Sequence, residues 1–470
     1  MPDAPVVPKA YLVESVPTGL EDLRGTPGVK YTEDVLVDLT GRAKLTIDLT
    51  AMYWALTPDP TSDDERGFTE KQFEQLGANS GRVLFQALRD AAERGVKIRI
   101  LESPGFSGQK QESETLREEF REQVKIHSIS MGDWYGGSGI MHQKIWIFDS
   151  ENLYLGSANM DWKSISQVKE MGIAVENCPQ LCEDAKSYFE AWWDFSALTP
   201  ASAEVFDPIV RIDRRVPPWS RLVPLSKRQG SPLAGTKYST TYNAQNPLAF
   251  KIGEQRGGAF LTGSPEEILG SGRAWDGDGL VYTIDDARRS VSVSVMDFSP
   301  TALFSRKSAG PPVGDEGVIP NDTPVWWPRL IDALLAAVLT RKIYVRLLVS
   351  KWAHTSSLIE PALRALQATA DAGRADKNMS TGQLEIKLFV IPGWDSTTGN
   401  SRKFPGHTRV NHTKYIVTDR RINIGTSNMT WDYFASTAGS SFNTDHPELV
   451  RTLQAVFDRD WASTYAYRLS

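Results

Sequence analysis

The feature that most constrains this chain is a motif that occurs twice, about 270 residues apart. The first copy reads His-Gln-Lys-Ile-Trp-Ile-Phe-Asp over 142–149 and is followed by Gly-Ser-Ala-Asn at 156–159. The second copy reads His-Thr-Lys-Tyr-Ile-Val-Thr-Asp over 412–419 and is followed by Gly-Thr-Ser-Asn at 425–428. Residue types and spacing coincide in both copies, which indicates a structural unit repeated once within the chain.

Segments around the two motifs recur at a similar offset. Matching pairs of predicted elements are the helical stretches 80–95 and 327–342, the strands 96–103 and 343–350, and the strands 124–130 and 385–391. Strands that alternate with helices of about 15 residues are typical of α/β units around a largely buried sheet. The sequence therefore predicts an α/β fold made of two homologous lobes, each a mixed β-sheet flanked by helices.

The boundaries of the lobes follow from a change in composition. Residues 216–248 are rich in Pro, Ser and Gly and show no sustained period, which favours a connection rather than a packed element. We expect an N-terminal lobe over 1–215, this connection over 216–248, and a C-terminal lobe over 249–470. Each lobe then carries one copy of the motif.

The strand period of two predicts how each motif presents its side chains. Residues at i and i+2 face the same way, so His142 lies with Lys144 and His412 lies with Lys414. Gly156 and Gly425, downstream of the two motifs, allow the backbone to approach closely. The polar residues that follow them can donate hydrogen bonds to anionic oxygens. These polar residues are Ser157, Asn159, Thr426 and Asn428. Two copies brought together form a pocket for one tetrahedral anion.

Such a pocket suits phosphoryl transfer through a covalent intermediate. A neutral imidazole can attack phosphorus while a protonated imidazole gives its proton to the leaving oxygen. The ordinary histidine pKa of about 6.5 allows one ring to be neutral and the other charged at mildly acidic pH. Lysines beside the equatorial oxygens stabilise the developing charge, as a metal ion does elsewhere. We therefore predict a site that needs neither a metal nor another cofactor.

Composition limits the partners and the class of protein. The net charge is −6, so the overall field weakly repels nucleic acid and anionic membranes, and a phosphodiester must be attracted locally in a cleft. The two cysteines are too few for a disulfide framework or a Cys-rich zinc site. No apolar run approaches the roughly 18 residues of a membrane span, and the first residues do not resemble a signal peptide.

With these residues identified, the chain resembles the phospholipase D superfamily, whose signature is His-x-Lys-x4-Asp with a downstream Gly-Ser-x-Asn, carried twice. Local identity favours its lysosomal 5′-exonuclease branch, the third and fourth mammalian paralogues. The segments that carry this resemblance are 12–15, 156–162, 167–170, 349–352, 409–412 and 425–428. The resemblance implies a single-chain pseudo-twofold dimer of two lobes. It also implies a metal-independent 5′-to-3′ exonuclease that shortens single-stranded DNA or RNA and releases nucleoside 3′-phosphates.

The resemblance also implies roles for individual residues. His142 is the nucleophile of a phosphohistidine intermediate, His412 is the general acid and then the base, and Glu170 orients a catalytic imidazole. The second half carries Ser436 where relatives have an acid nearby, so we expect the second histidine to be oriented from elsewhere.

The motif aspartates Asp149 and Asp419 follow β-runs at a point where a turn is expected. We interpret them as turn or strand-end residues that support the motif.

The substrate and the surroundings leave alternatives open. Exonucleases stack bases on aromatic rings. The candidates are Trp134 and Tyr135, just before His142, and Trp352 and His354, which follow a predicted strand end; packing or capping is the alternative for each and is the one favoured. A phospholipase D or transphosphatidylase would use the same histidines on phospholipid headgroups, and a noncatalytic binding protein is the third hypothesis. Family resemblance implies a homodimer and a lysosomal or lumenal location, whereas the missing signal, the missing anchor and the few cysteines leave the compartment unknown.

Overall fold

The computed structural model describes residues 8–104, 111–136, 139–303, 325–376, 378–399 and 401–469. The first half folds around an eight-stranded sheet in the order β2-β1-β10-β8-β7-β3-β5-β6. Its strands are β1 (Lys9–Ser15), β2 (Val29–Tyr31), β3 (Thr46–Ala51), β5 (Lys97–Glu102), β6 (Val124–Ser128), β7 (Ile145–Phe148), β8 (Asn152–Gly156) and β10 (Glu170–Glu176). Strands β3, β5 and β6 run parallel, and the hairpin β7–β8 joins β3 to β10 through antiparallel pairs.

The second half repeats this arrangement in a ten-stranded sheet. Its order is β13-β14-β21-β20-β19-β16-β17-β18-β22, and β15 also pairs with β14. Its strands are β13 (Leu248–Ile252), β14 (Gln255–Ser264), β15 (Ala274–Trp275), β16 (Ser290–Val295), β17 (Tyr344–Ser350), β18 (Gln383–Phe389), β19 (Lys414–Thr418), β20 (Ile422–Gly425), β21 (Gly439–Thr444) and β22 (Ala466–Arg468). The path β1-β10-β8-β7-β3-β5-β6 corresponds strand by strand to β14-β21-β20-β19-β16-β17-β18. The prediction of two repeated α/β units with mixed sheets is confirmed.

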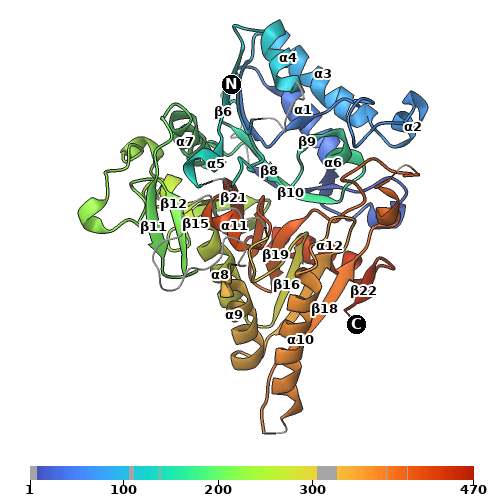
Figure 1. The fold of residues 1–470 in the computed structure, drawn as a ribbon. Helices are drawn as coiled ribbons and strands as arrows, with labels where there is room; N and C mark the ends of the chain where they lie inside the picture. Colours follow the sequence, from blue (N-terminus) through green and yellow to red (C-terminus); the bar gives the residue numbers. More distant parts are fainter. Residues whose placement is uncertain are drawn as a thin grey trace.

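Helices cover both sheets (Figure 1). In the first half they are α1 (Thr32–Arg42), α2 (Glu70–Gln75), α3 (Asn79–Glu93), α4 (Glu112–Glu119), α5 (Met131–Trp134), α6 (Trp162–Ser166) and α7 (Pro179–Phe195). In the second half they are α8 (Asp276–Asp286), α9 (Arg329–Leu335), α10 (Ile359–Ala375), α11 (Trp431–Ala435) and α12 (Pro447–Ala462). A π-helical turn, Ala336–Thr340, continues α9. None of the helices in the described ranges combines the length and apolarity that a membrane crossing requires.

Smaller elements fill the connections. These are the two-stranded pair β4 (Trp54–Ala55) and β9 (Met160–Asp161), and the hairpin β11 (Ala203–Asp207) and β12 (Ile212–Val216). Between β12 and β13 the described chain forms only the short 3-10 turns Leu225–Lys227 and Thr236–Tyr238. The predicted connection, 216–248, overlaps this irregular stretch and adds one strand residue at each end.

The central strands are apolar on both faces, as expected for sheets covered by helices on each side. One core cluster lies on the outer face of the first sheet and includes Leu39 of α1 and Leu88 of α3. Another lies on the outer face of the second sheet and includes Leu347. The third runs between the sheets, where Leu155 of β8 and Phe457 of α12 belong to one cluster. Because this central core is shared, the halves pack as one body (Figure 1).

Ion pairs reinforce the seam between the halves. Arg459 of α12 reaches Glu14 of β1 with an N···O distance of 2.9 Å. Lys169, just before β10, lies 2.9 Å from Asp460 of the same helix. All of these groups except Arg459 are almost fully buried. Removing one partner would leave an uncompensated buried charge, which costs about 3–5 kcal/mol. The seam is therefore a fixed interface that can hold a site between the halves.

Candidate active site

The two motif histidines meet at the seam between the halves. Each precedes the first strand of its hairpin, β7 or β19, and each backbone N–H bonds to the opposite half. His142 N donates to the carbonyl of Ala438 at 3.1 Å, and His412 N donates to the carbonyl of Lys169 at 2.8 Å. The ring centroids are 6.4 Å apart. The structure therefore brings the two predicted catalytic imidazoles together in one site.

Each motif lysine folds back onto its own histidine. Nζ of Lys144 donates to the carbonyl of His142, and Nζ of Lys414 donates to the carbonyl of His412, both at 2.7 Å. Both side chains are almost fully buried. Burial lowers the pKa of Lys414 to about 7, although the charges of Glu170 and other nearby acids oppose this shift. Burial, followed by the charge of Lys414, lowers the pKa of Lys144 well below its ordinary value.

This pair of lysines defines an anion pocket. Two ammonium groups in a buried site are costly unless a negative charge compensates them. A phosphate group between them supplies that charge, so the pocket favours a tetrahedral anion.

Glu170 reaches across the seam to the histidine of the other half. At the start of β10, its two carboxylate oxygens lie 2.9 and 2.8 Å from Nδ1 of His412. Burial lowers the pKa of His412, and the charge of Glu170 is the largest influence that raises it again. This contact fixes the ring and leaves Nε2 of His412 for proton transfer. The structure thus shows Glu170 beside a motif imidazole, as the sequence predicted.

His142 has a different environment. Its Nδ1 is buried and meets no hydrogen-bond partner within the described residues. Burial lowers its pKa well below the ordinary value, and the charges of Lys144, Lys414 and His412 lower it further. His412 is thus oriented from outside its own half, by Glu170, which agrees with the expectation that the second histidine is oriented from elsewhere. Within the described residues, no carboxylate contacts Nδ1 of His142.

The two motif asparagines line the same region. Asn428 is buried, and its Nδ2 donates to Asp297 at 3.0 Å. Asn159 is half-buried, and its Oδ1 has no hydrogen-bond partner in the part of the chain that the structure describes. Burial raises the pKa of Asp297 to about 6, and the charge of Lys414 acts in the opposite direction.

Sequence reasoning missed Asp297. It lies two residues beyond β16, at the carboxyl end of a central strand. Ligands of open α/β sheets bind at the carboxyl ends of strands. The position of Asp297 after a predicted central strand could therefore have identified it as a site residue.

Two of the predicted polar donors hold strands instead of facing the pocket. The hydroxyl of Ser157 donates to the carbonyl of Met171 at 3.2 Å and accepts from its N–H at 3.0 Å. The hydroxyl of Thr426 accepts from the N–H of Ser440 at 3.1 Å. These bonds fix β10 and β21 against β8 and β20. The two residues therefore position the strands that flank the site.

The motif aspartates lie at the far end of their hairpins. Asp149 accepts the backbone N–H groups of Lys44, Leu45 and Thr46 at 2.7–2.8 Å, and Asp149 itself has φ +53°. Asp419 accepts the backbone N–H groups of residues 288–290 at 3.0–3.2 Å. Burial would raise the pKa of Asp419, but these backbone donors lower it. Both carboxylates thus hold the start of a central strand, β3 or β16, which agrees with their interpretation as strand-end residues.

Two aromatic candidates for base stacking belong to the core. Trp134 is 3% exposed and packs 4.5 Å from Phe195, centroid to centroid. Tyr135 is 4% exposed, and its hydroxyl donates to Glu267 at 3.3 Å. Neither ring offers a face to a nucleobase, so the prediction that they bind substrate is wrong. Trp134 ends helix α5 and Tyr135 follows it directly, and both rings lie in the core.

The other aromatic candidates form a cluster at the carboxyl end of β17. Trp352 is half-buried and lies 4.8 Å from the exposed His354. His354 stacks on the exposed His407 at 4.6 Å and an interplanar angle of 8°. Sequence reasoning did not single out His407. Its proximity depends on the fold, because it comes from the segment that leads to the second motif.

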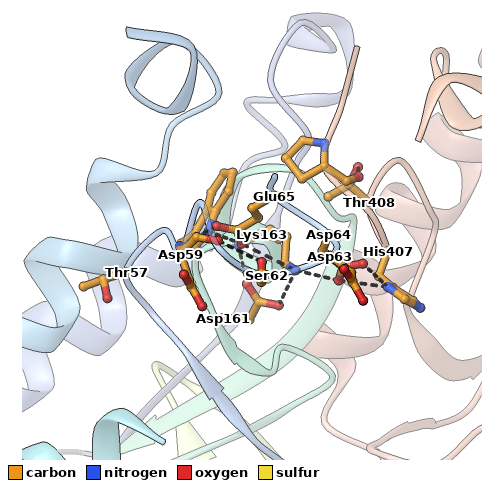
Figure 2. A network of polar contacts seen from close by, with 12 residues as sticks. Thr57, Asp59, Ser62, Asp63, Asp64, Glu65, Asp161, Lys163, His407 and Thr408 are labelled. Carbon is orange, nitrogen blue, oxygen red and sulfur yellow. Dashed lines mark hydrogen bonds and ion pairs between the residues drawn. The ribbon is translucent and has the colours of Figure 1, made fainter. Parts of the chain in front are cut away.

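A buried polar network anchors this cluster to the first half (Figure 2). Figure 2 shows Lys163 among the carboxylates of Asp64, Glu65 and Asp161, with His407 beyond Asp64; the Lys163 N···O distances are 3.2–3.7 Å. His407 Nδ1 lies 3.0 Å from Asp64. Burial raises the pKa of Glu65 to about 7, although the charge of Lys163 lowers it. The network therefore ties the segment before the second motif to the loop before α2.

The side chains that could bind a metal ion are spread apart. Across the described ranges, no three His, Cys, Asp or Glu side chains converge in a way that could hold a metal ion. The positive charges that face the pocket belong to Lys144 and Lys414.

Comparison with known proteins agrees with this geometry. Residues 225–394 match the family "PLD3/4, PLD-like domain", and residues 72–193 match "Cardiolipin synthase, PLD-like domain". The chain is 33% identical over 467 residues to the 5'-3' exonuclease PLD3 of Xenopus tropicalis, covering 97% of this chain and 80% of the relative. The chain belongs to the phospholipase D superfamily. Its similarity places it in the PLD3 branch of that superfamily.

Further relatives support this membership. The human 5'-3' exonuclease PLD3 is 31% identical over 464 residues, covering 98% of this chain and 81% of the relative. Phospholipase D Z of Dictyostelium discoideum is 31% identical over 438 residues, covering 93% and 86%. The phosphatidylserine synthase of Haemophilus influenzae shares the fold, with a TM-score of 0.51, 9% identity, and coverage of 93% of this chain and 84% of that chain. The protein is accordingly an enzyme of this superfamily of phosphodiesterases.

Proposed function

We propose that this enzyme is a 5′-to-3′ exonuclease on single-stranded DNA or RNA that works through a phosphohistidine intermediate and needs no metal ion. The single observation that carries the chemistry is the unequal pair of imidazoles at the seam, one bound to a carboxylate and the other not. The substrate class rests on similarity to relatives named 5'-3' exonuclease PLD3.

The unequal environments assign the two roles. The pKa of His142 is lowered well below its ordinary value by burial and by neighbouring positive charges, so this ring stays neutral in mild acid. A neutral imidazole has the lone pair that a nucleophile needs. Glu170 raises the pKa of His412 against the effect of burial and stabilises its protonated form. His142 is therefore the nucleophile, and His412 is the general acid.

The reaction then proceeds in two balanced steps. The imidazole of His142 attacks phosphorus, the bond from phosphorus to the 5′-oxygen of the next nucleotide breaks, and Nε2 of His412 gives that oxygen its proton. Water then attacks the phosphohistidine, His412 takes the proton of the water, and the P–N bond breaks. The products are a nucleoside 3′-phosphate and a chain with a new 5′-hydroxyl end, which is the next substrate.

The lysines stabilise charge in both steps. Lys144 and Lys414 lie in one buried site, and burial lowers the pKa of both. A bound phosphate raises these pKa values again, because its negative charge stabilises the ammonium form. Preorganised charges in a buried site stabilise a transition state without reorganisation. They take the place that a metal ion has in other phosphoryl-transfer enzymes.

The exposed cluster beside the site is the proposed base platform. The exposed rings of His354 and His407 are stacked, and the half-buried Trp352 meets His354 edge-on. Base stacking on such rings contributes about 1–3 kcal/mol per base. Substitution His354→Ala should raise KM for oligonucleotides while kcat for a mononucleotide phosphodiester stays within about twofold. An unchanged KM would exclude the platform.

The test of the function uses a 5′-hydroxyl oligonucleotide labelled at its 3′ end, in excess EDTA near pH 5.5. The expected result is a ladder that shortens from the 5′ end, absent for His142→Asn. Phosphatidylcholine vesicles with added ethanol are assayed in parallel. An intact oligonucleotide together with transfer of the phosphatidyl group to ethanol would replace this proposal with the phospholipase D alternative.

A further inference from the structure

One position beside the site carries different residues in the two halves. Beyond β3 and β16, the chain pairs in parallel with the segment that follows the motif asparagine, at Trp54 in the first half and at Phe298 in the second. The preceding residues, Tyr53 and Asp297, therefore occupy equivalent positions. The first half has a neutral phenol where the second half has a carboxylate.

The first half keeps its own acid away from the motif lysine. The hydroxyl of Tyr53 donates to Asp161 at 2.8 Å. Asp161 also lies 3.7 Å from Nζ of Lys163, within the polar network of Figure 2. Its charge is therefore balanced by a cation that is not part of the motif. Among the described residues, the acid whose charge raises the pKa of Lys144 is Glu170 and not Asp161.

Asp297 instead faces the anion pocket. It is buried, and its Oδ2 accepts from Nδ2 of Asn428 at 3.0 Å. Burial raises the pKa of Asp297 to about 6, and the charge of Lys414 lowers it. Burial also raises the pKa of Tyr433, as does the charge of Asp297, and the ring centroid of Tyr433 lies 5.1 Å from that of His142. Asp297 is therefore part of the wall of this pocket.

The charges around the pocket match a ligand with one negative charge. In the proposed mechanism, the carboxylate of Glu170 offsets protonated His412. The carboxylate of Asp297 offsets Lys414, whose pKa its charge raises. The charge of Lys144 then remains, and a single negative charge on the ligand neutralises it. A buried excess charge is costly, so a ligand with two negative charges is disfavoured.

This balance separates a phosphodiester from a phosphate monoester. A phosphodiester has one ionisable proton and carries one negative charge, whereas a phosphate monoester loses a second proton at about pH 6 and carries nearly two. Repulsion by a fixed carboxylate grows with the charge of the ligand, so Asp297 weakens binding of the monoester more than binding of the diester. Hydrolysis converts one into the other, and the product no longer matches the pocket.

We propose that Asp297 determines the charge selectivity of the pocket, which binds a singly charged phosphodiester and favours release of a doubly charged phosphate monoester. The hydrogen bond from Asn428 fixes the place of this carboxylate in the pocket wall. The first half has Tyr53 at this position and contributes no charge there. The inference rests on the proposed function, whose product is a phosphate monoester.

The first experiment compares two small ligands that differ in charge, methyl phosphate and dimethyl phosphate. At pH 7, Asp297→Asn should tighten binding of methyl phosphate relative to dimethyl phosphate by roughly 3- to 10-fold, measured by isothermal titration calorimetry. At pH 5 both ligands carry one charge and Asp297 is protonated, because its pKa is about 6, so the ratio of dissociation constants should equal that of wild type. An unchanged ratio at pH 7, or an equal change at both pH values, would overturn the proposal.

Further variants separate charge from structure. Asp297→Ser removes the charge with a smaller side chain and should shift the ratio at pH 7 as Asp297→Asn does, whereas Asp297→Glu keeps the charge and should keep the wild-type ratio. Asp432→Asn is the matched control, because Asp432 is another buried aspartate of the second half and accepts the backbone N–H of Leu303 at 2.8 Å. A shift in this control as large as that of Asp297→Asn contradicts the proposal.

Failure of the proposed function is distinguishable from failure of this inference. If wild type cleaves no oligonucleotide, the function fails, whereas methyl phosphate and dimethyl phosphate contain no nucleoside and still measure the charge selectivity of the pocket. With an active enzyme, adenosine 3′-phosphate at pH 7 should inhibit Asp297→Asn roughly 3- to 10-fold more strongly than wild type. Equal inhibition of the two would contradict the role of Asp297 in product release.

Discussion

The two half-sites share their motif but differ in how they hold it. His412 has a carboxylate 2.8 Å from Nδ1, supplied by the opposite half. In the second half the position equivalent to Glu170 is Gly439, and no carboxylate within the described residues contacts Nδ1 of His142. Both rings are buried next to lysine, so burial alone would make them equal. In the proposed mechanism, this difference between the two opposing residues separates the nucleophile, His142, from the general acid, His412.

This comparison shows how a duplicated unit becomes an asymmetric site. Each half contributes a histidine and a lysine that folds back onto the carbonyl of that histidine, whereas the acids are placed unequally. The charges of Glu170 and Asp297 both raise the pKa of Lys414, whereas among the described residues Glu170 is the acid whose charge raises the pKa of Lys144. The two halves keep the same strand register although Glu170 of β10 is replaced by Gly439 at the equivalent position of β21. One such replacement changes the charge near a histidine and leaves the pairing of the strands unchanged.

The largest effect is expected from the histidines themselves. His142→Asn and His412→Asn should each lower kcat by at least about 1,000-fold on an oligonucleotide, since each removes a group that acts only in the transition state. A p-nitrophenyl phosphodiester should distinguish the two variants, because its leaving group needs no proton from a general acid. His412→Asn should still form a phosphoenzyme with it, and His142→Asn should not. Acid-labile phosphate on the protein, followed by mass spectrometry, measures this, and the reverse pattern would exchange the two roles.

The next effect should come from Glu170. Glu170→Gln keeps the side-chain shape but removes the charge that raises the pKa of His412, so that pKa falls further below its ordinary value. The general acid must be protonated, so activity falls as pH rises through this pKa. The alkaline limb of the kcat profile should therefore move to lower pH, and kcat should drop roughly 10- to 100-fold.

The control for this shift is the p-nitrophenyl phosphodiester. With this substrate, the alkaline limb of the kcat profile should depend less on Glu170. If the Glu170→Gln limb stays in place on the oligonucleotide, His412 is not the acid.

A smaller, structural effect is expected from the motif aspartates. Asp149→Asn and Asp419→Asn remove charged acceptors of three backbone N–H groups each, which should cost about 1–3 kcal/mol of unfolding free energy. Asp149 should cost more because its hydrogen bonds are shorter. Urea unfolding measures the loss. Turnover per folded molecule should stay within about twofold of wild type. A loss of kcat without a loss of stability would show that these residues take part in catalysis.

The smallest effect is stabilisation by a tetrahedral anion. Millimolar sulfate, matched in ionic strength with chloride, should raise Tm by roughly 1–4 °C, because it binds between two lysines that lack a full countercharge. Lys144→Met should remove this shift more completely than Lys414→Met, since Lys414 already has Asp297 nearby. Equal shifts in the two variants would show that the lysines are equivalent after all.

Much of the site was predictable from local pattern. The repeated His-x-Lys and Gly-x-x-Asn segments predicted His142, Lys144, His412 and Lys414, and the structure brings them together. Alternating strands and helices predicted the fold class, and the extent of similarity to known proteins confirms the superfamily. The prediction failed for Trp134 and Tyr135, because aromatic residues near a motif can point towards the core or towards solvent, and local sequence does not decide which. Compartment, homodimer formation and the domain boundaries stay predictions.

The sequence by itself determined which chemical groups each half supplies, because strand period and motif spacing are local properties. Only the tertiary structure decided which groups meet. Glu170 and His412 are 242 residues apart, and their contact depends on the register of β10 and on how the two sheets dock. The same docking bonds the backbone N–H of His142 to the carbonyl of Ala438 in the other half. Electrostatic environment is a sum over neighbours in space, so it becomes defined only when both halves are packed.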